Sequence, residues 1–407
     1  MKKGLRALVA ASAVTGLIVG AVTGSSAAPR NNPLKGEGKN MKIVANVGYP
    51  GGTDMEFATI KGHDYAFAGS ASGVGGAKAG ALHVINIDNP AKPRVAATLN
   101  CSLYQADIQI SYDQKTVIMG ADSAGGPDGC LALGQAGFMT VDIRNPMKPK
   151  PIGFAAIPAG SHNTTAHPTK PYVYNSDSEL AKRGEIQIWS IKDPSKPKLV
   201  NTIPSLPHSP HDISFNKDGS LMVTAAISHF DIYDTSDPEN PTLLYEGQCP
   251  GCSITHDAKF TPDGKHIVIG DEGGGGGAYP CPGGALYFYD FSTPPVPVLT
   301  GVYEPDELVL AKDDQGGPEG CTAHVFDFND KGNLVSISWY SAGTRLLDIS
   351  SMIGPSFGGN TAAGVQELGW FEPDGGVSWS SKIYTNDKYI FSNDENRGFD
   401  VFQYTGK

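Results

Sequence analysis

After residue 41 the sequence contains no convincing helical periodicity and no apolar run long enough to cross a bilayer. It also lacks a basic block beyond its first residues, and 42 acidic against 31 basic residues give a formal net charge of −11. That charge argues against nucleic acid or an acidic membrane surface as a partner.

Glycine and proline are abundant by contrast, with 51 and 30 residues, which suits a loop-rich all-β protein better than a helical one. Along most of the chain, short apolar runs alternate with turns. This alternation is typical of β-strands joined by hairpins.

The N-terminus has the organisation of an export signal. Residues 1–28 begin with Lys and Arg, continue as an apolar run and end in small residues, as in a secretory signal peptide. The apolar run is close to spanning length, so an uncleaved anchor is the alternative, although the small residues favour cleavage. Residues 29–40 predict a disordered linker. We therefore expect a secreted or extracytoplasmic protein with no membrane span after cleavage, and its even number of six cysteines fits an oxidising compartment.

Two phrases recur along the chain. One is a strand that runs into a Pro-x-x-Pro turn, and the first prolines of these turns are 44 to 56 residues apart: Pro90, Pro146, Pro194, Pro238 and Pro294. The other is a hairpin with an Asp/Gly turn, as in "FNKDGSLMVTA" (215–225) and "FTPDGKHIVIG" (260–270). A hairpin, a third strand, the proline turn and a fourth strand make one four-stranded blade, and the period is that of propeller blades.

The repeat predicts one all-β domain over residues 41–407, a seven-bladed β-propeller. The expected blades start near residues 54, 103, 161, 208, 253, 321 and 377. The last blade supplies only three strands before the chain ends, so the unassigned strand 41–49 is expected to complete it and close the ring, which removes an exposed edge. An open sandwich would not explain the repeat.

The phrases "ALHVINIDNPAKP" (81–93) and "GFMTVDIRNPMKP" (137–149) resemble the LVIVD-repeat proteins, secreted β-propellers named for that strand. The resemblance covers residues 55 to 300. It implies the propeller fold and an extracytoplasmic location, but it implies no single reaction.

A histidine recurs at one place in the repeat. When the units are aligned on the residue that ends the first strand of each hairpin, four consecutive blades carry a histidine four residues earlier, and we call this position the histidine slot: His162, His211, His256 and His324. Blade two has Ala106 in this slot and blade seven has Ser380. Because the first strand is innermost and starts beside the central channel, the four imidazoles are expected to be metal ligands around one channel mouth. His208, in the loop over the same mouth, is expected to be a further ligand or a general base.

Acidic residues follow the second strands at this mouth and are expected behind the imidazoles or against a substrate, together with one further histidine. These candidates are Asp122, Asp177, Glu179, His229, Asp271, Glu272, Asp394 and Glu395. A carboxylate behind an imidazole fixes the tautomer of a metal ligand. Several neutral nitrogen donors suit copper, zinc or iron, and copper(II) binds most tightly. The plan is similar to that of the selenium-binding or methanethiol oxidase propellers, which are histidine-bearing copper enzymes, although no motif matches residue by residue.

These features predict a metal-dependent oxidoreductase that acts on a small molecule. The alternative is a non-catalytic scaffold that binds a small ligand or a protein partner on its loop face, with histidines that only support turns, as in WD-type propellers. A water-lined channel without function is the third possibility. A structural histidine should also recur in blades two and seven, so its restriction to four neighbouring blades favours a site.

All six cysteines fall in loops at the histidine-bearing mouth, and an exported chain favours disulfides there. Cys101 is expected to pair with Cys130 within blade two. Cys281 is expected to pair with Cys249 or Cys252, preferably Cys252, leaving the other for Cys321. A metal-binding pair in "CPGC" (249–252) is the alternative.

Overall fold

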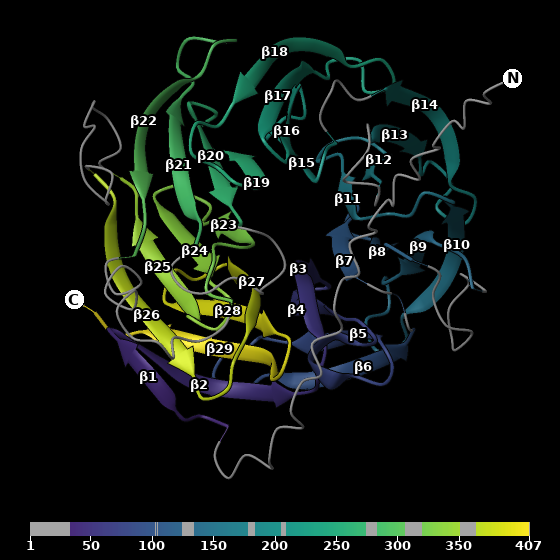
Figure 1. Cartoon of the computed structure of the whole chain (residues 1–407). Helices are drawn as coiled ribbons and strands as arrows, with labels where there is room; N and C mark the ends of the chain where they lie inside the picture. Colours follow the sequence, from purple (N-terminus) through teal and green to yellow (C-terminus); the bar gives the residue numbers. More distant parts are fainter. Residues whose placement is uncertain are drawn as a thin grey trace, which may run out of the picture.

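The computed structural model describes residues 33–101, 103, 105–123, 134–177, 184–204, 209–273, 283–305, 320–350 and 364–406. Its strands form seven antiparallel sheets arranged as a ring around a central opening (Figure 1). The predicted seven-bladed β-propeller is therefore confirmed. Within the described part of the chain the only helical element is one 3-10 turn, η1 (Val74–Gly76).

The first three blades each consist of four strands that follow one another in the sequence. Blade one contains β3 (Gly52–Ile60), β4 (His63–Ser70), β5 (Ala81–Asn86) and β6 (Arg94–Asn100). Blade two contains β7 (Gln105–Ile110), β8 (Thr116–Ala121), β9 (Gly137–Asp142) and β10 (Lys150–Ala156). Blade three contains β11 (Asn163–Ala166), β12 (Tyr172–Ser176), β13 (Glu185–Ser190) and β14 (Lys198–Pro204).

Blades four and five repeat this order, and the last two blades each take in a strand from the N-terminus. Blade four contains β15 (Asp212–Phe215), β16 (Leu221–Ala226), β17 (His229–Asp234) and β18 (Thr242–Gln248). Blade five contains β19 (Thr255–Phe260), β20 (His266–Asp271), β21 (Ala285–Asp290) and β22 (Val298–Tyr303). Blade six contains β23 (Phe326–Phe328), β24 (Leu334–Ser338), β25 (Thr344–Asp348), β26 (Gln366–Pro373) and β1 (Gly36–Lys39). Blade seven contains β27 (Ser378–Ile383), β28 (Tyr389–Asp394), β29 (Gly398–Tyr404) and β2 (Met41–Gly48).

The N-terminal strand closes the ring as the sequence predicted. β2 pairs antiparallel with β29, from Met41 opposite Tyr404 to Gly48 opposite Gly398. Blade seven thus reaches four strands by joining the two ends of the chain.

The linker expected over residues 29–40 is wrong at its C-terminal end, because Gly36–Lys39 form β1 on the outer edge of blade six. Two glycines make this possible. A Cβ on Gly36 would lie 2.3 Å from the carbonyl oxygen of Glu372, and a Cβ on Gly38 would lie 2.5 Å from the ring of Phe371. Only a residue without a side chain fits against β26 at these two positions.

The hydrophobic core is divided into seven clusters, each between two adjacent blades. Both faces of each blade are therefore buried, which explains why strands such as β8 are buried along their whole length. The first strands lie nearest the opening (Figure 1), so one edge of every blade faces a shared channel.

No helix among the described residues has the length and apolarity needed to cross a bilayer. Residues 1–28, predicted to be the signal peptide, lie outside the described residues.

Candidate metal centre

The four histidines predicted from the repeat lie side by side at one channel mouth. Ring centroids are 4.4 Å apart for His162 and His211, 4.2 Å for His211 and His256, and 4.1 Å for His256 and His324. All four residues are buried, with exposed fractions of 2 to 8%. We call these four residues the histidine layer.

Equivalent backbone positions produce this arrangement. The amide N–H groups of His162, His211 and His324 each donate to the carbonyl at the end of the second strand of their own blade. His256 is instead the extra residue of a β-bulge between Thr255 and Asp257. A bulge redirects a side chain at the end of a ladder.

Blade seven has the same bulge, between Ser378 and Ser380. Trp379 is therefore the counterpart of His256, so the assignment of Ser380 to the histidine slot is wrong by one residue. β27 ends at Ile383, four residues after Trp379, so the sequence comparison placed the end of this strand one residue too late. The Trp379 ring lies 4.7 Å from the ring of His324, edge to face, and extends the layer into blade seven.

Backbone carbonyls fix the tautomers of two members of the layer. His211 Nδ1 lies 3.0 Å from the carbonyl oxygen of His256, and His324 Nδ1 lies 2.6 Å from that of Trp379. A carbonyl oxygen only accepts, so each Nδ1 carries the proton and each Nε2 keeps its lone pair. His211 Nε2 faces His162 Nε2 at 2.9 Å.

Three imidazoles of the layer have a pKa below the ordinary value. Burial, followed by the neighbouring imidazoles His162 and His324, holds the pKa of His211 well below its usual value. Burial and the other three imidazoles do the same to the pKa of His256. Burial lowers the pKa of His324 to about 4. Neutral imidazoles are the form that binds a metal ion.

Two of the predicted carboxylates lie beside the layer. One ligating atom each from His211, His256 and Glu272 fall within 4.8 Å of one another, the only such group of three in the described part of the chain. Glu272 Oε1 is 3.9 Å from His324 Nε2 and accepts a 2.7 Å hydrogen bond from the hydroxyl of Tyr340. Asp122 Oδ2 lies 3.4 Å from His162 Nδ1. Tyr340 was not predicted, because it lies two residues beyond the end of its strand and belongs to none of the recurring motifs.

The other acidic candidates lie elsewhere at the same mouth. Asp271 accepts from the amides of Ser253 and Ile254, and Asp394 accepts from those of Val377, Asn396 and Arg397. Asp177 accepts from the amide of Glu185. These three carboxylates support loops.

Glu395 is partly buried, and its pKa is raised to about 8 by burial and by the charges of Asp394 and Glu272. His229 does not end a second strand as expected. It begins β17, because β16 stops at Ala226, and its Nδ1 lies 2.8 Å from Ser228 Oγ. His208 and Glu179 lie outside the described residues.

One disulfide differs from the prediction. Cys249 is bonded to Cys252, so neither pairs with Cys281 or Cys321 as expected. The two Cα atoms are 5.4 Å apart across a turn, within the range that a disulfide spans. Cys101 and Cys321 are also disulfide-bonded, and none of the described cysteines is free. Cys130, the expected partner of Cys101, lies outside the described residues, as does Cys281.

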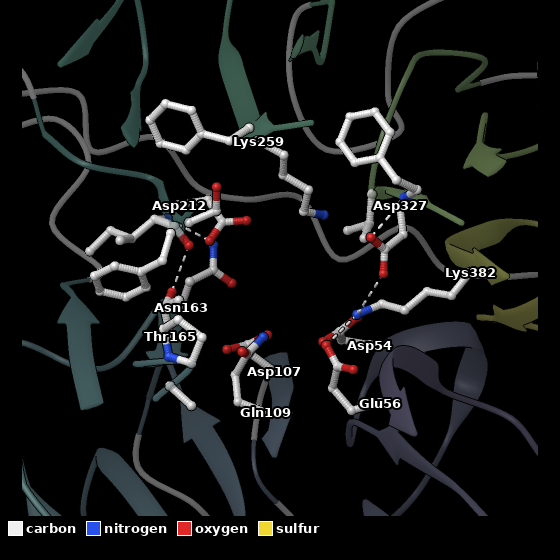
Figure 2. Close-up of a pocket in the computed structure, with 18 of the residues that line it drawn as sticks. Asp54, Glu56, Asp107, Gln109, Asn163, Thr165, Asp212, Lys259, Asp327 and Lys382 are labelled. Carbon is white, nitrogen blue, oxygen red and sulfur yellow. Dashed lines mark hydrogen bonds and ion pairs between the residues drawn. The ribbon is translucent and has the colours of Figure 1, made fainter. Parts of the chain in front are cut away.

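A cavity of about 630 Å³ continues from the histidine layer along the channel. Charged side chains of the first strands point into it, as Figure 2 shows for Asp54, Asp107, Asp212, Lys259 and Lys382. They stand one or three residues after the histidine slot, on the strand face that looks inward. The sequence signal was available, since alternate positions of the first strands are polar, but such alternation normally marks a solvent-facing strand.

No family model matches the chain, and no curated protein matches its sequence. Solved structures do resemble it. The β-propeller domain of Myceliophteria thermophila Cps50 (Swd1) superposes with a TM-score of 0.60 at 11% identity, covering 89% of this chain and 99% of that one. Kuenenia stuttgartiensis hydrazine synthase gives a TM-score of 0.63 at 12% identity, over 89% and 98%. A functionally unknown protein from Desulfotomaculum acetoxidans DSM 771 gives 0.52 at 15%, over 78% and 88%. At such identities the likeness establishes the propeller fold alone.

Proposed function

We propose that the histidine layer binds a transition-metal ion, copper before zinc or iron, and that the protein is an extracytoplasmic metal-dependent oxidoreductase acting on a small molecule. The observation that carries the proposal is the grouping of His211, His256 and Glu272 within 4.8 Å, with His162 and His324 on either side. The residues 1–28 and the disulfides support export.

The donor set fits such an ion. His256 Nδ1 is buried with no hydrogen-bond partner among the described residues, and a buried polar atom of that kind needs an explanation. The 2.9 Å between the Nε2 atoms of His162 and His211 matches neighbouring ligands at about 2 Å from one ion in a square-planar site, the geometry that copper(II) favours.

The chain's own residues would orient and shield the centre. The bonds from Nδ1 of His211 and His324 to backbone carbonyls preset the ring positions, which strengthens ligand binding. Tyr340 holds the Glu272 carboxylate, and Trp379 covers one side of the layer. The cavity beneath offers a small molecule access to His211, His256 and His324. A role for His208 as ligand or general base is part of the proposal.

The test is the metal content of the purified mature protein. After incubation with copper, zinc or iron(II) and removal of free metal, we expect about one copper ion per chain. The electron paramagnetic resonance spectrum of the copper(II) form should show coupling to several imidazole nitrogens. A protein that retains no metal from any of the three solutions contradicts the proposal.

One observation favours the alternative of a non-catalytic LVIVD-type binding scaffold. The bonds from His211 to His256 and from His324 to Trp379 each tie one blade to the next, which is a structural role. Under that alternative, histidine variants should lose stability alike and no metal should bind. Measuring melting temperature beside metal content separates the two functions.

A further inference from the structure

The channel beneath the histidine layer has two walls with different charge. On the side of blades five to seven, each lysine is matched by carboxylates (Figure 2). Lys382 donates to Glu56 and lies 4.0 Å from Asp327, and Lys259 Nζ lies 2.7 Å from Asp257 Oδ2. Burial alone would lower the pKa of Lys382, but attraction by Glu56, Asp54 and Asp327 holds it well above its usual value. The two lysines are therefore paired with carboxylates, one of which, Glu56, belongs to blade one.

The wall formed by blades one, two and four carries three carboxyl groups. Two of them face lysines across the channel: Lys382 attracts Asp54, and burial raises the pKa of Asp212 to about 7 although Lys259 lowers it. We call Asp54, Asp107 and Asp212 the acidic wall. They stand in blades one, two and four at equivalent positions, one residue after the histidine slot, and they line the cavity together. None of the three forms an ion pair within 4.0 Å with a basic group in the described part of the chain.

Two members of the acidic wall use only one oxygen to hold the neighbouring blade. Asp107 Oδ2 accepts from the amide and hydroxyl of Thr164, at 2.7 and 3.0 Å. Asp54 Oδ2 accepts from the amide of Ile108 at 3.3 Å. Asp54 Oδ1 is buried without a hydrogen-bond partner, although Asp54 is only 6% exposed and lines the cavity. A buried carboxylate oxygen left without a donor is costly, so a donor that arrives with a ligand would be stabilised there.

Asp107 is buried beside the two other carboxyl groups of the acidic wall. Burial, followed by the charges of Asp54 and Asp212, raises the pKa of Asp107 well above its usual value. A cation placed between these carboxyls would relieve that repulsion.

The cation cannot be a bare metal ion held by the wall. No three carboxylate, imidazole or thiol groups of the described chain approach within 4.8 Å except His211, His256 and Glu272. A protonated amine is larger and reaches several carboxylates through three diverging N–H donors. A cavity of about 630 Å³ is also of the size that holds a small organic molecule.

We propose that the channel binds a small organic molecule carrying a protonated amine, with its ammonium group against Asp54, Asp107 and Asp212 and its other end toward the histidine layer. As the substrate class of the oxidoreductase, this inference rests on the proposed function. The prediction that the channel binds an amine does not itself depend on the proposed function.

The test measures binding to metal-free, chelator-treated native protein by isothermal titration calorimetry. The probe is butylamine, with butan-1-ol as its neutral counterpart and magnesium chloride as an inorganic cation. The variants are Asp54→Asn, Asp107→Asn and Asp212→Asn. Asn keeps the acceptor oxygen used by Ile108 and Thr164, so the blades should stay joined, and thermal melting checks that they do. Asp193→Asn, in an exposed turn outside the channel, is the matched control.

We expect saturable binding of butylamine and at least tenfold weaker binding of butan-1-ol. Each acidic-wall variant should lose at least tenfold in butylamine affinity, whereas Asp193→Asn should bind like the native protein. Equal binding of amine and alcohol, unchanged affinity in all three variants, or no saturable binding overturns the inference. Displacement of butylamine by magnesium at equal concentration overturns the organic class of ligand. Because the protein carries no metal in this experiment, failure of the metal proposal leaves these outcomes unchanged.

Discussion

The channel has two levels built from the same first strands, and they differ in how the sequence encodes them. The upper level, the histidine layer, uses a rare residue that recurs in one slot of four consecutive blades. The level beneath uses aspartate, glutamate and lysine, so the residue type at equivalent positions changes from blade to blade. The upper level consists of imidazoles, three of which have a lowered pKa, and it suits a soft or borderline cation, whereas the lower level is lined with carboxyl groups and suits an amine.

The largest expected effect is on metal binding in the upper level. His211→Ala removes a ligand that touches both neighbouring imidazoles, so copper affinity should fall by more than about 100-fold, beyond the loss typical of residues outside the coordination sphere. Competition with a chromogenic chelator measures this. Butylamine binding should change less than about twofold, because the acidic wall is intact.

His63→Ala is the matched control, since His63 is exposed on a turn beside Asp88. If His211→Ala weakens both ligands equally, the two levels are not separate sites.

Tyr340→Phe should have a smaller effect that is confined to the upper level. It removes the hydroxyl that donates to Glu272 and leaves the ring between His324 and Trp379. Loss of a supporting hydrogen bond of this kind costs about 10- to 100-fold in metal affinity. The melting temperature of the metal-free protein should change little, which distinguishes positioning of Glu272 from general support. A stability loss with unchanged copper affinity would contradict the role of Glu272.

The contributions of the two levels to the stability of the fold should change with pH in opposite directions. The pKa of His324 is about 4 in the folded protein and about 6.5 in the unfolded chain. The contribution of His324 to the free energy of unfolding is therefore complete above about pH 6.5 and is lost as the pH falls toward 4. The pKa of Asp107 is raised, so its unfolded form ionises first and stability falls as the pH rises above about 4. Asp107→Asn should therefore raise the melting temperature at pH 8 by a few degrees and change it less at pH 5. His324→Gln should flatten the acid side of the profile instead. Melting curves of the metal-free native protein and the two variants from pH 4 to 9 test both expectations. A variant whose melting temperature shifts by the same amount at every pH would contradict the pKa direction given for the residue that it replaces.

The smallest expected effect concerns the disulfide at the same mouth. Replacing Cys249 and Cys252 together by Ser opens a very short loop, so the free energy of unfolding should fall by about 2 kcal/mol. Copper affinity should stay within about twofold of the native value. A larger loss of copper affinity would indicate that "CPGC" (249–252) is part of the metal centre.

The sequence was sufficient for the fold because each blade repeats its own signals. Asp/Gly hairpins place Gly219, Gly264 and Gly332 at positive φ, and the proline turns recur at a fixed place, so blade number and ring closure could be counted. Strand β1 could not be predicted in this way. It depends on two glycines fitting against β26, more than 300 residues away, and glycine alone indicates a loop as readily as a close contact.

The site was predictable only where one uncommon residue type recurred at equivalent positions of the blades. Histidine is uncommon and marked the upper level, and Glu272 and Asp122 followed from the end of the second strand. Trp379 was missed because β27 ends at Ile383, one residue earlier than the sequence comparison assumed. The acidic wall was missed because aspartate in a polar strand looks the same whether it faces bulk water or a closed channel. Burial decides which, and burial follows from the whole ring rather than from any one strand.

Joining the two ends of the chain in blade seven also sets the order in which the molecule can be completed. Asn46 bonds to Asp400 across 354 residues, so β2 leaves the ribosome long before its partner exists. Contacts of such separation form late and slowly. During synthesis, blades one to five can assemble in turn, while β2 remains unsatisfied until the last strand appears. We therefore expect the ring of the nascent protein to stay open through nearly all of its synthesis and to close only when its final residues arrive.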